Sequence, residues 1–217
     1  LHKIYNLNIN FNKYFKNYDF HNLYKELLNF CTVDLSAFYF DIRKDTLYCD
    51  PKDSQKRKST IILLNIILNS LLKWFAPILS FTTEEIYRLL FDSKKSVHLE
   101  KFINFPQNFY NPKLNEKWLE LIKIRNICNI SIEEKRSSKE IGSSLEADLK
   151  IVLDQKLKDT TKNIDFSELC ITSKAMVTYN ENTEVNVETI KAKGTKCPTC
   201  WKINDTACQR TTCPKLT

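Results

Sequence analysis

Four cysteines lie close together near the end of the 217-residue chain, in a segment with few apolar residues. They are Cys197, Cys200, Cys208 and Cys213, so the spacing is C-x2-C, seven residues, then C-x4-C. Two local thiol pairs can bend around one ion. Tetrahedral thiolate ligation then supplies folding free energy to a segment that is too short for an apolar core. The pattern predicts one structural Zn²⁺ held by these four residues.

Two other interpretations of the cysteines stay open: a pair of disulfides in an oxidising compartment, or a redox-active C-x2-C site. The stretch "LHKIYNLNINFNKYF" has no apolar signal segment. The C-x2-C pair also lacks the strand–helix–strand pattern that surrounds redox sites of this kind. Both observations favour zinc, in a protein that we expect to be cytoplasmic.

Basic residues surround these thiols. From residue 191 onward there is one acidic residue, Asp205, and the basic residues are Lys191, Lys193, Lys196, Lys202, Arg210 and Lys215. Trp201 directly follows a predicted ligand, and an exposed tryptophan among lysines is a platform on which a nucleobase can stack. Packing of Trp201 against the neighbouring part of the chain is an equal alternative. We expect RNA contacts from Lys196, Trp201, Lys202 and Arg210.

Glycine is scarce, with only Gly142 and Gly194 in the chain, and this favours helices over tight hairpins. Apolar spacing predicts helices over residues 19–40, 61–81 and from about 114 onward. Thr82 and Glu85 suggest a capping box that opens a further helix through Phe91. Residues 41–59 are polar and are predicted to form a loop. The apolar stretch 61–81 is expected to be a buried bundle helix and not a membrane span, because polar residues and Pro77 interrupt it.

Beyond Ala147 the segments "LKIVL", "LCITSKAMV" and "EVNVETIKA" are short and β-branched, which predicts a small sheet with a helix near residues 156–162. The predicted fold class is therefore mainly α. The predicted domains are a helical bundle over 1–147, a small α+β junction module over 148–190, and a zinc knuckle over 191–217. The net charge of +7 is compatible with a polyanionic partner.

Several stretches, in this order, resemble the C-terminal part of bacterial isoleucyl-tRNA synthetases. They are "FCTVDLSAFYFDIRKDTLYCD", "LLKWFAPILSFTTEEIYRLL", "SVHLEKF", "WLELIKIRN", "IGSSLEADLKI", "ELCITSKAMV" and "AKGTKCPTCWK". The resemblance implies an α-helical anticodon-binding domain, a junction module and a zinc-binding end that contacts tRNA(Ile). Cys197, Cys200 and Trp201 match the family pattern. The second cysteine pair departs from it, since the family has C-x2-C after a longer loop.

The resemblance also implies a full enzyme that joins isoleucine to tRNA with ATP. The HIGH and KMSKS motifs of that chemistry are absent from this sequence: His2, His21 and His98 lie in other contexts, and Met176 lies in "SKAMV". We therefore expect no catalytic residues in the chain, and ATP only in a missing catalytic part.

Further phosphate contacts are expected from Arg125 and Arg136, which share a helix face at a spacing near three turns. An ordinary surface pair between Arg136 and Glu133 or Glu134 is an equal alternative. The expected partner is tRNA(Ile), with a monomeric chain and with neither a membrane nor DNA involved. The alternatives are a zinc-dependent protein-interaction module and an inactive synthetase fragment.

Overall fold

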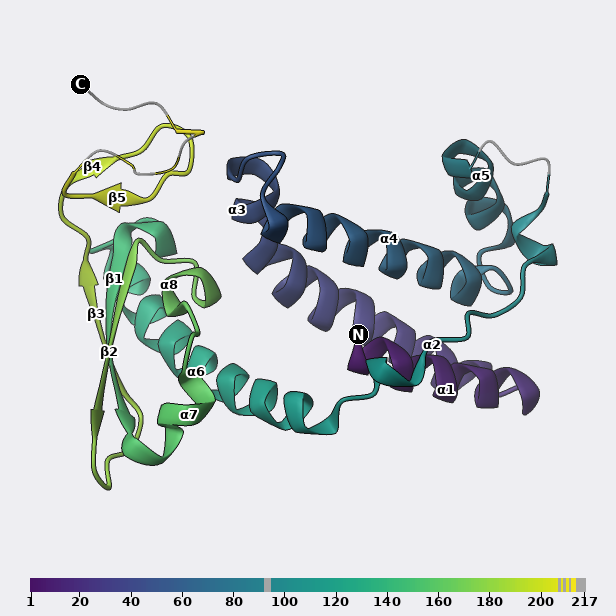
Figure 1. Cartoon of the computed structure of the whole chain (residues 1–217), viewed down its shortest axis with the longest axis horizontal. Helices are drawn as coiled ribbons and strands as arrows, with labels where there is room; N and C mark the ends of the chain where they lie inside the picture. Colours follow the sequence, from purple (N-terminus) through teal and green to yellow (C-terminus); the bar gives the residue numbers. More distant parts are fainter. Residues whose placement is uncertain (92–94, 207, 209, 211, 214–217) are drawn as a thin grey trace. The chain divides into compact units, whose positions relative to one another are not determined.

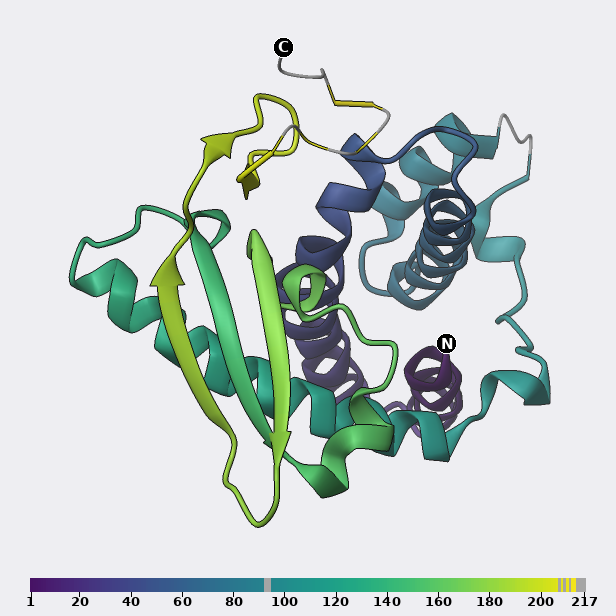
Figure 2. The same cartoon turned by 60° about the vertical axis from the view of Figure 1, so that its left-hand side comes forward.

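A computed structural model describes residues 1–91, 95–206, 208, 210, 212 and 213 (Figures 1 and 2). The chain forms two compact units, each assembled from two segments. The first comprises Leu1–Phe40 and Lys52–Pro112, and the second Asp41–Pro51 and Lys113–Thr217. The mainly α class is confirmed, with a small sheet and the four cysteines toward the C-terminus. The three-domain division at 147 and 190 stays a prediction.

The first unit is built from helices. They are α1 (His2–Lys16), α2 (Phe20–Asn29), the π-helix η1 (Phe30–Phe40), α4 (Gln55–Phe75), α5 (Ser80–Phe91) and the 3₁₀ turns η2 (Val97–Leu99) and η3 (Gln107–Phe109). Trp74 of α4 is buried in the core between the rings of Phe11 and Phe30. Its indole Nε1 donates a hydrogen bond of 3.1 Å to Oδ1 of Asn8. This bond satisfies the one polar atom that the large side chain brings into the core.

The structure confirms that the segments predicted over 19–40 and 61–81 are helical, but the helices begin and end at other residues. Helix α4 begins earlier, where the Ser54 hydroxyl accepts a hydrogen bond from the backbone N–H of Arg57 at 3.4 Å. It ends at Phe75, because Pro77 has no backbone N–H with which to continue the helical hydrogen bonds. Helix α1 was not predicted, although its buried Ile4, Leu7 and Phe11 repeat at helical spacing.

The predicted capping box at Thr82 is wrong, because α5 already begins at Ser80 and places Thr82 inside the helix. In the first turns of α5, the Glu84 carboxylate makes hydrogen bonds to another part of the chain. It accepts hydrogen bonds from the backbone N–H of Val97 at 2.9 Å and from the Ser96 hydroxyl at 2.8 Å. The contact ties α5 to the start of η2, a partner that the local sequence pattern does not reveal.

Helix α4 is, among the described residues, the one helix long and apolar enough to cross a membrane by length and composition. A core helix of a soluble protein passes the same test. Ile67 and Trp74 of α4 belong to the apolar core of the first unit, which is the packing expected of a bundle helix.

The second unit places helix α6 (Pro112–Ser137) across one face of a three-stranded sheet (Figure 2). The strands are β1 (Ala147–Asp154), β2 (Lys174–Asn180) and β3 (Asn186–Lys191), in the order β2-β1-β3. Strand β1 runs parallel to β2 and antiparallel to β3. The short helical pieces η4 (Ser144–Glu146), η5 (Gln155–Leu157), α7 (Lys158–Thr161) and α8 (Phe166–Leu169) flank them. The predicted sheet and the helix near 156–162 are thus confirmed.

Alternate residues of β1 are buried, and the Ser131 hydroxyl of α6 lies 2.7 Å from that of Thr189 on β3. The helix therefore packs on the buried face of the sheet.

The loop predicted over 41–59 is wrong at both ends. Helix α3 (Asp41–Cys49) follows η1 directly (Figure 1), and α4 already begins at Gln55. Its buried residues Ile42, Thr46 and Cys49 recur at i, i+4 and i+7, the spacing of one helix face. The many charged residues between them give the segment its loop-like composition. This helix belongs to the second unit, together with the terminal cysteines.

Candidate metal centre

A small antiparallel hairpin, β4 (Thr195–Lys196) with β5 (Ile203–Asn204), carries the first cysteine pair in its turn. The backbone N–H of Cys197 donates to the carbonyl of Lys202 at 2.9 Å. That of Trp201 donates to the carbonyl of Cys197 at 3.0 Å. These bonds close the turn so that Cys197 and Cys200 direct their sulfurs to the same side, as metal ligation by a C-x2-C pair requires.

Gly194 starts this hairpin in a backbone conformation that side chains rarely adopt, with φ at +121°. A Cβ atom there would lie only 2.2 Å from the carbonyl oxygen of Asn204. The close approach of two backbones therefore requires a glycine at this position.

Replacing Gly194 by alanine should therefore destabilise the hairpin by at least about 1 kcal/mol. We expect faster amide hydrogen exchange at residues 195–204 and weaker metal binding. Gly142→Ala is the matched control, because its Cβ would meet nothing closer than a Glu146 carboxylate oxygen at 3.4 Å and its φ is ordinary. Equal behaviour of the two variants would contradict the close-approach argument.

The second pair joins the first to form a compact cluster of four sulfurs. The Sγ atoms of Cys197, Cys200, Cys208 and Cys213 all lie within 4.8 Å of one another. Those of Cys200 and Cys208 are 3.8 Å apart, which matches the edge of about 3.8 Å in a tetrahedron with Zn–S bonds of about 2.3 Å. All eight cysteines are free thiols. The donor set fits a single tetrahedral, thiophilic ion.

The electrostatics of the cluster favour thiolate at one position in particular. Burial by itself raises the pKa of Cys197, but backbone N–H groups of Cys200 and Thr199 donate toward its sulfur and lower the pKa to about 7. Burial raises the pKa of Cys200 to about 11. The Cys197 thiol is therefore partly ionised near neutral pH, and the thiolate is the form that binds a metal ion.

Trp201 is exposed to 60 %, so its ring is not packed into the α+β part of the chain. Its backbone has φ of +62°, a left-handed conformation that is uncommon for a bulky residue. Such a conformation costs free energy, about 1–3 kcal/mol. The structure thus holds a large aromatic ring in solvent at a strained position.

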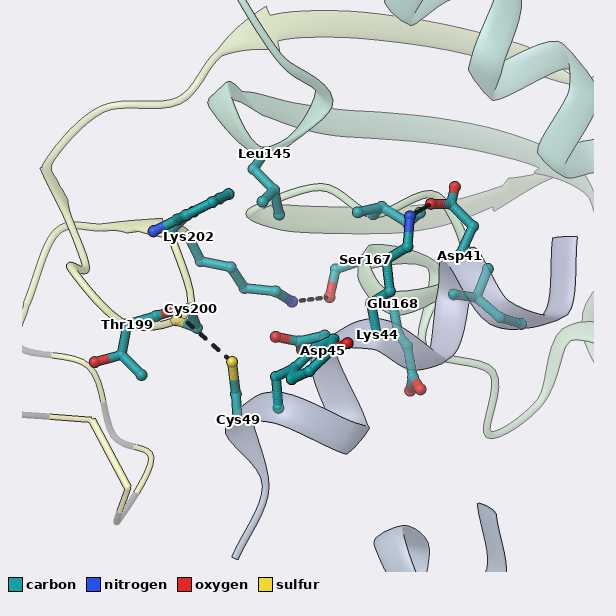
Figure 3. A pocket seen from close by; sticks show the side chains of 14 residues that line it. Asp41, Lys44, Asp45, Cys49, Leu145, Ser167, Glu168, Thr199, Cys200 and Lys202 are labelled. Atoms are coloured by element: carbon teal, nitrogen blue, oxygen red, sulfur yellow. Dashed lines mark hydrogen bonds and ion pairs between the residues drawn. The ribbon is translucent and has the colours of Figure 1, made fainter. Parts of the chain in front are cut away.

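A cavity of about 380 Å³ opens beside this ring (Figure 3). Its walls come from α3, the residues around α8 and the C-x2-C turn. Tyr48 and Trp201 contribute exposed rings, and Ile42, Leu145 and Ile171 contribute apolar surface. The residues from α3 were not predicted to belong to a site, because α3 itself was not predicted; the spacing of Ile42, Thr46 and Cys49 was the available signal.

Charged groups of this cavity are arranged in pairs. Asp41 pairs with Lys44 at 2.9 Å, and Glu168 pairs with Arg43 at 2.8 Å. Asp45 receives both terminal nitrogens of Arg210. Burial alone would raise the pKa of Asp45, but the Arg210 guanidinium lowers it below the usual value. The ammonium group of Lys202 donates to the Ser167 hydroxyl at 3.3 Å (Figure 3). The carboxylates are thus neutralised by neighbouring cations, so the cavity does not repel an anionic ligand.

The remaining predicted RNA contacts lie apart from this cavity. Lys196 is 3.8 Å from Glu146, in an exposed pair. The Arg125 Nε donates to the Leu169 carbonyl at 2.9 Å. Arg136 pairs with Glu133 at 2.6 Å, which is the surface pair named as the alternative.

Comparison with known proteins identifies the family to which the chain belongs. Residues 1–153 match the model of the anticodon-binding domain of tRNA ligase. The chain is 65 % identical over 210 residues to the isoleucine–tRNA ligase of Pelagibacter ubique (strain HTCC1062), covering 97 % of the chain and 23 % of the relative. It is 37 % identical over 213 residues to the isoleucine–tRNA ligase of Bartonella henselae, and the match covers 93 % of the chain and 22 % of the relative. It is 39 % identical over 197 residues to the isoleucine–tRNA ligase of Agrobacterium fabrum, and the match covers 86 % of the chain and 20 % of the relative.

These matches confirm the resemblance to the C-terminal part of bacterial isoleucyl-tRNA synthetases. The chain spans between 20 % and 23 % of the length of these three relatives.

Proposed function

Because the chain belongs to the family of anticodon-binding domains of tRNA ligases, we propose that it recognises the anticodon region of tRNA(Ile) as part of an isoleucine–tRNA ligase. The observation that carries this proposal is the family match over residues 1–153, together with the isoleucine–tRNA ligases among the relatives. The joining of isoleucine to tRNA with ATP belongs, in this proposal, to the larger remainder of such a protein. The cytoplasmic location and the monomeric state stay predictions.

The metal of the thiol cluster is proposed to be a single structural Zn²⁺. Four cysteine sulfurs within 4.8 Å of one another match the donor set of structural zinc sites, in which four thiolates would hold the ion and leave no open position. The residues that would hold it are Cys197, Cys200, Cys208 and Cys213. Its chemistry is to crosslink two loops that have almost no apolar core, which keeps Trp201 in position.

Trp201 and the cavity beside it are proposed to receive an unstacked base of the anticodon loop. Bases of single-stranded RNA loops are recognised by stacking on aromatic side chains and by hydrogen bonds to their edges. The exposed, strained Trp201 offers the ring, and Ser167 and Lys202 offer polar groups beside it.

Among the basic residues, Lys196, Lys202 and Arg136 are the proposed phosphate or base contacts. The ion pairs of Lys196 and Arg136 are exposed, and such pairs contribute only about 0–1 kcal/mol, so RNA phosphates can replace the carboxylates. Arg125 and Arg210 are bound to groups of the protein itself. These bonds fix the orientation of both guanidinium groups and occupy some of their donors.

The test is fluorescence anisotropy of the chain with labelled tRNA(Ile) and with the same tRNA carrying a different anticodon. We expect tighter binding of the native anticodon and a fall in affinity from low to moderate salt, because phosphate contacts release counterions. Trp201→Ala should weaken binding by about 1–3 kcal/mol, or roughly 5- to 150-fold, and should reduce the preference for the native anticodon.

Tyr18→Ala provides the matched control. Tyr18 is also an exposed aromatic residue with a positive φ, of +54°, but it belongs to the first unit and does not line the cavity. Its replacement should leave the anticodon preference unchanged. Equal affinity of the chain for both tRNAs would reject anticodon recognition, and equal effects of the two variants would reject the role of Trp201.

A further inference from the structure

A fifth cysteine lies against the four-sulfur cluster. Cys49, the last residue of α3, is exposed to only 7 % and packs with Cys197, Cys200, Cys208 and Cys213. It precedes them by about 150 residues in the sequence and is not one of the four whose sulfurs lie within 4.8 Å of one another. A buried thiol this close to a set of metal ligands is either a further ligand or a group that holds the ligands in place.

The contacts of Cys49 indicate the second role. Its Sγ lies 3.9 Å from the carbonyl oxygen of Thr199 and donates to it (Figure 3). Thr199 stands inside the C-x2-C turn, directly before the ligand Cys200. The thiol therefore contacts the backbone of the loop that carries the first ligand pair, at a sulfur–oxygen distance near the upper limit for a weak S–H···O hydrogen bond.

The same turn of α3 also holds the loop that carries the second ligand pair. The Thr212 hydroxyl, next to Cys213, donates to the backbone carbonyl of Cys49. The Arg210 guanidinium, between Cys208 and Cys213, makes two bonds to the Asp45 carboxylate, one of them 2.7 Å long. Asp45 and Cys49 are four residues apart and so lie on one face of the helix.

We propose that the last turn of α3 is the outer layer of the metal centre, with Cys49 and Asp45 as positioning residues for the two ligand loops. Cys49 fixes the C-x2-C turn through Thr199, and Asp45 fixes the second loop through Arg210. Neither binds the ion. The inference rests on the proposed metal site, and it assigns to Arg210 a structural role within that site.

The physical reason for such a layer is the shortness of the ligand loops. A cluster with almost no apolar surroundings brings four sulfurs together at a large cost in chain entropy, and only the ion offsets it. Contacts that order the loops before the ion arrives lower this cost and raise the affinity. Groups around metal ligands typically change metal affinity by about 10- to 100-fold when they are replaced.

The experiment is a Co²⁺ titration of the 217-residue chain, read by thiolate-to-cobalt charge-transfer absorption, followed by competition with Zn²⁺ to obtain affinities. The intensity at saturation counts thiolate ligands, and the titration midpoint reports affinity. Cys49→Ala should keep the full intensity but lower the affinity about 10-fold. Cys49→Ser, which keeps a donor at this position, should recover most of that loss.

Cys31→Ala is the control for loss of a thiol, since Cys31 packs against the core of the first unit. If Cys49 were a ligand, both of its variants would lose about a quarter of the intensity, one thiolate in four, and the proposal would be overturned. Wild-type affinity in Cys49→Ala would overturn it as well. A wild-type chain that shows no thiolate charge transfer would reject the metal site itself, which separates the two failures.

Asp45 is tested on the same helix with its own control. Asp45→Asn removes the charge that pairs with Arg210, and metal release to a chelator should become about 10-fold faster with intensity unchanged. Asp41→Asn removes an exposed carboxylate that pairs with Lys44 on the same helix, and it should leave the rate as it is. Equal release rates for the two variants would refute the role of Asp45.

Discussion

Cys197→Ser should abolish stoichiometric metal binding and leave the β4–β5 hairpin unfolded. Structural zinc sites with thiolate ligands contribute about 10–16 kcal/mol of apparent binding free energy, which in small modules is also folding free energy. Cys197 is almost fully buried, and its neighbours lower the pKa of its thiol to about 7, so serine replaces a ligand that ionises readily. The measurements are metal content after gel filtration and amide hydrogen exchange at residues 195–204.

Cys31→Ser is the control for this substitution, because that residue belongs to the first unit. It should retain one equivalent of metal and a protected hairpin. A Cys197→Ser protein that keeps one tightly bound equivalent would show that the cluster is not a single four-thiolate site.

Trp74→Ala should destabilise the first unit by about 3–5 kcal/mol, the range for deleting a large buried aromatic side chain. Trp74 is 1 % exposed, and its ring meets that of Phe11 edge-on at a centroid distance of 4.9 Å. The substitution opens a cavity and also removes the donor to Asn8, whose amide is itself buried. Urea unfolding followed by far-UV circular dichroism would measure the change.

Trp74→Phe separates the two causes. It retains most of the apolar volume and loses the indole N–H, so it should cost less than the alanine variant, and Asn8→Ala should add little to it. A loss below about 1 kcal/mol in Trp74→Ala would mean that α1, α2 and α4 do not share the core described above.

The cysteine set and the class of the fold were determined by the sequence itself. C-x2-C and C-x4-C place two thiols within one turn each, so the tendency to surround an ion is a local property. The helices predicted over 19–40, over 61–81 and from about 114 onward follow from apolar periodicity, which is also local, whereas the bounds found in the structure differ from these ranges. The order of the family-like segments, ending in "KCPTCWK", is by itself enough to indicate the synthetase family.

Only the tertiary structure revealed that helix α3 lies against the four-cysteine cluster. Asp45 and Arg210 are separated by 165 residues, and Cys49 and Thr199 by 150. In sequence, Asp45 lies in a charged stretch and Arg210 resembles a phosphate contact. Their mutual contact depends on packing between distant segments, which residue spacing along the chain does not encode. The exposure of Trp201 was likewise decided by the backbone of a two-stranded hairpin, because a module this small has no core in which to bury an indole.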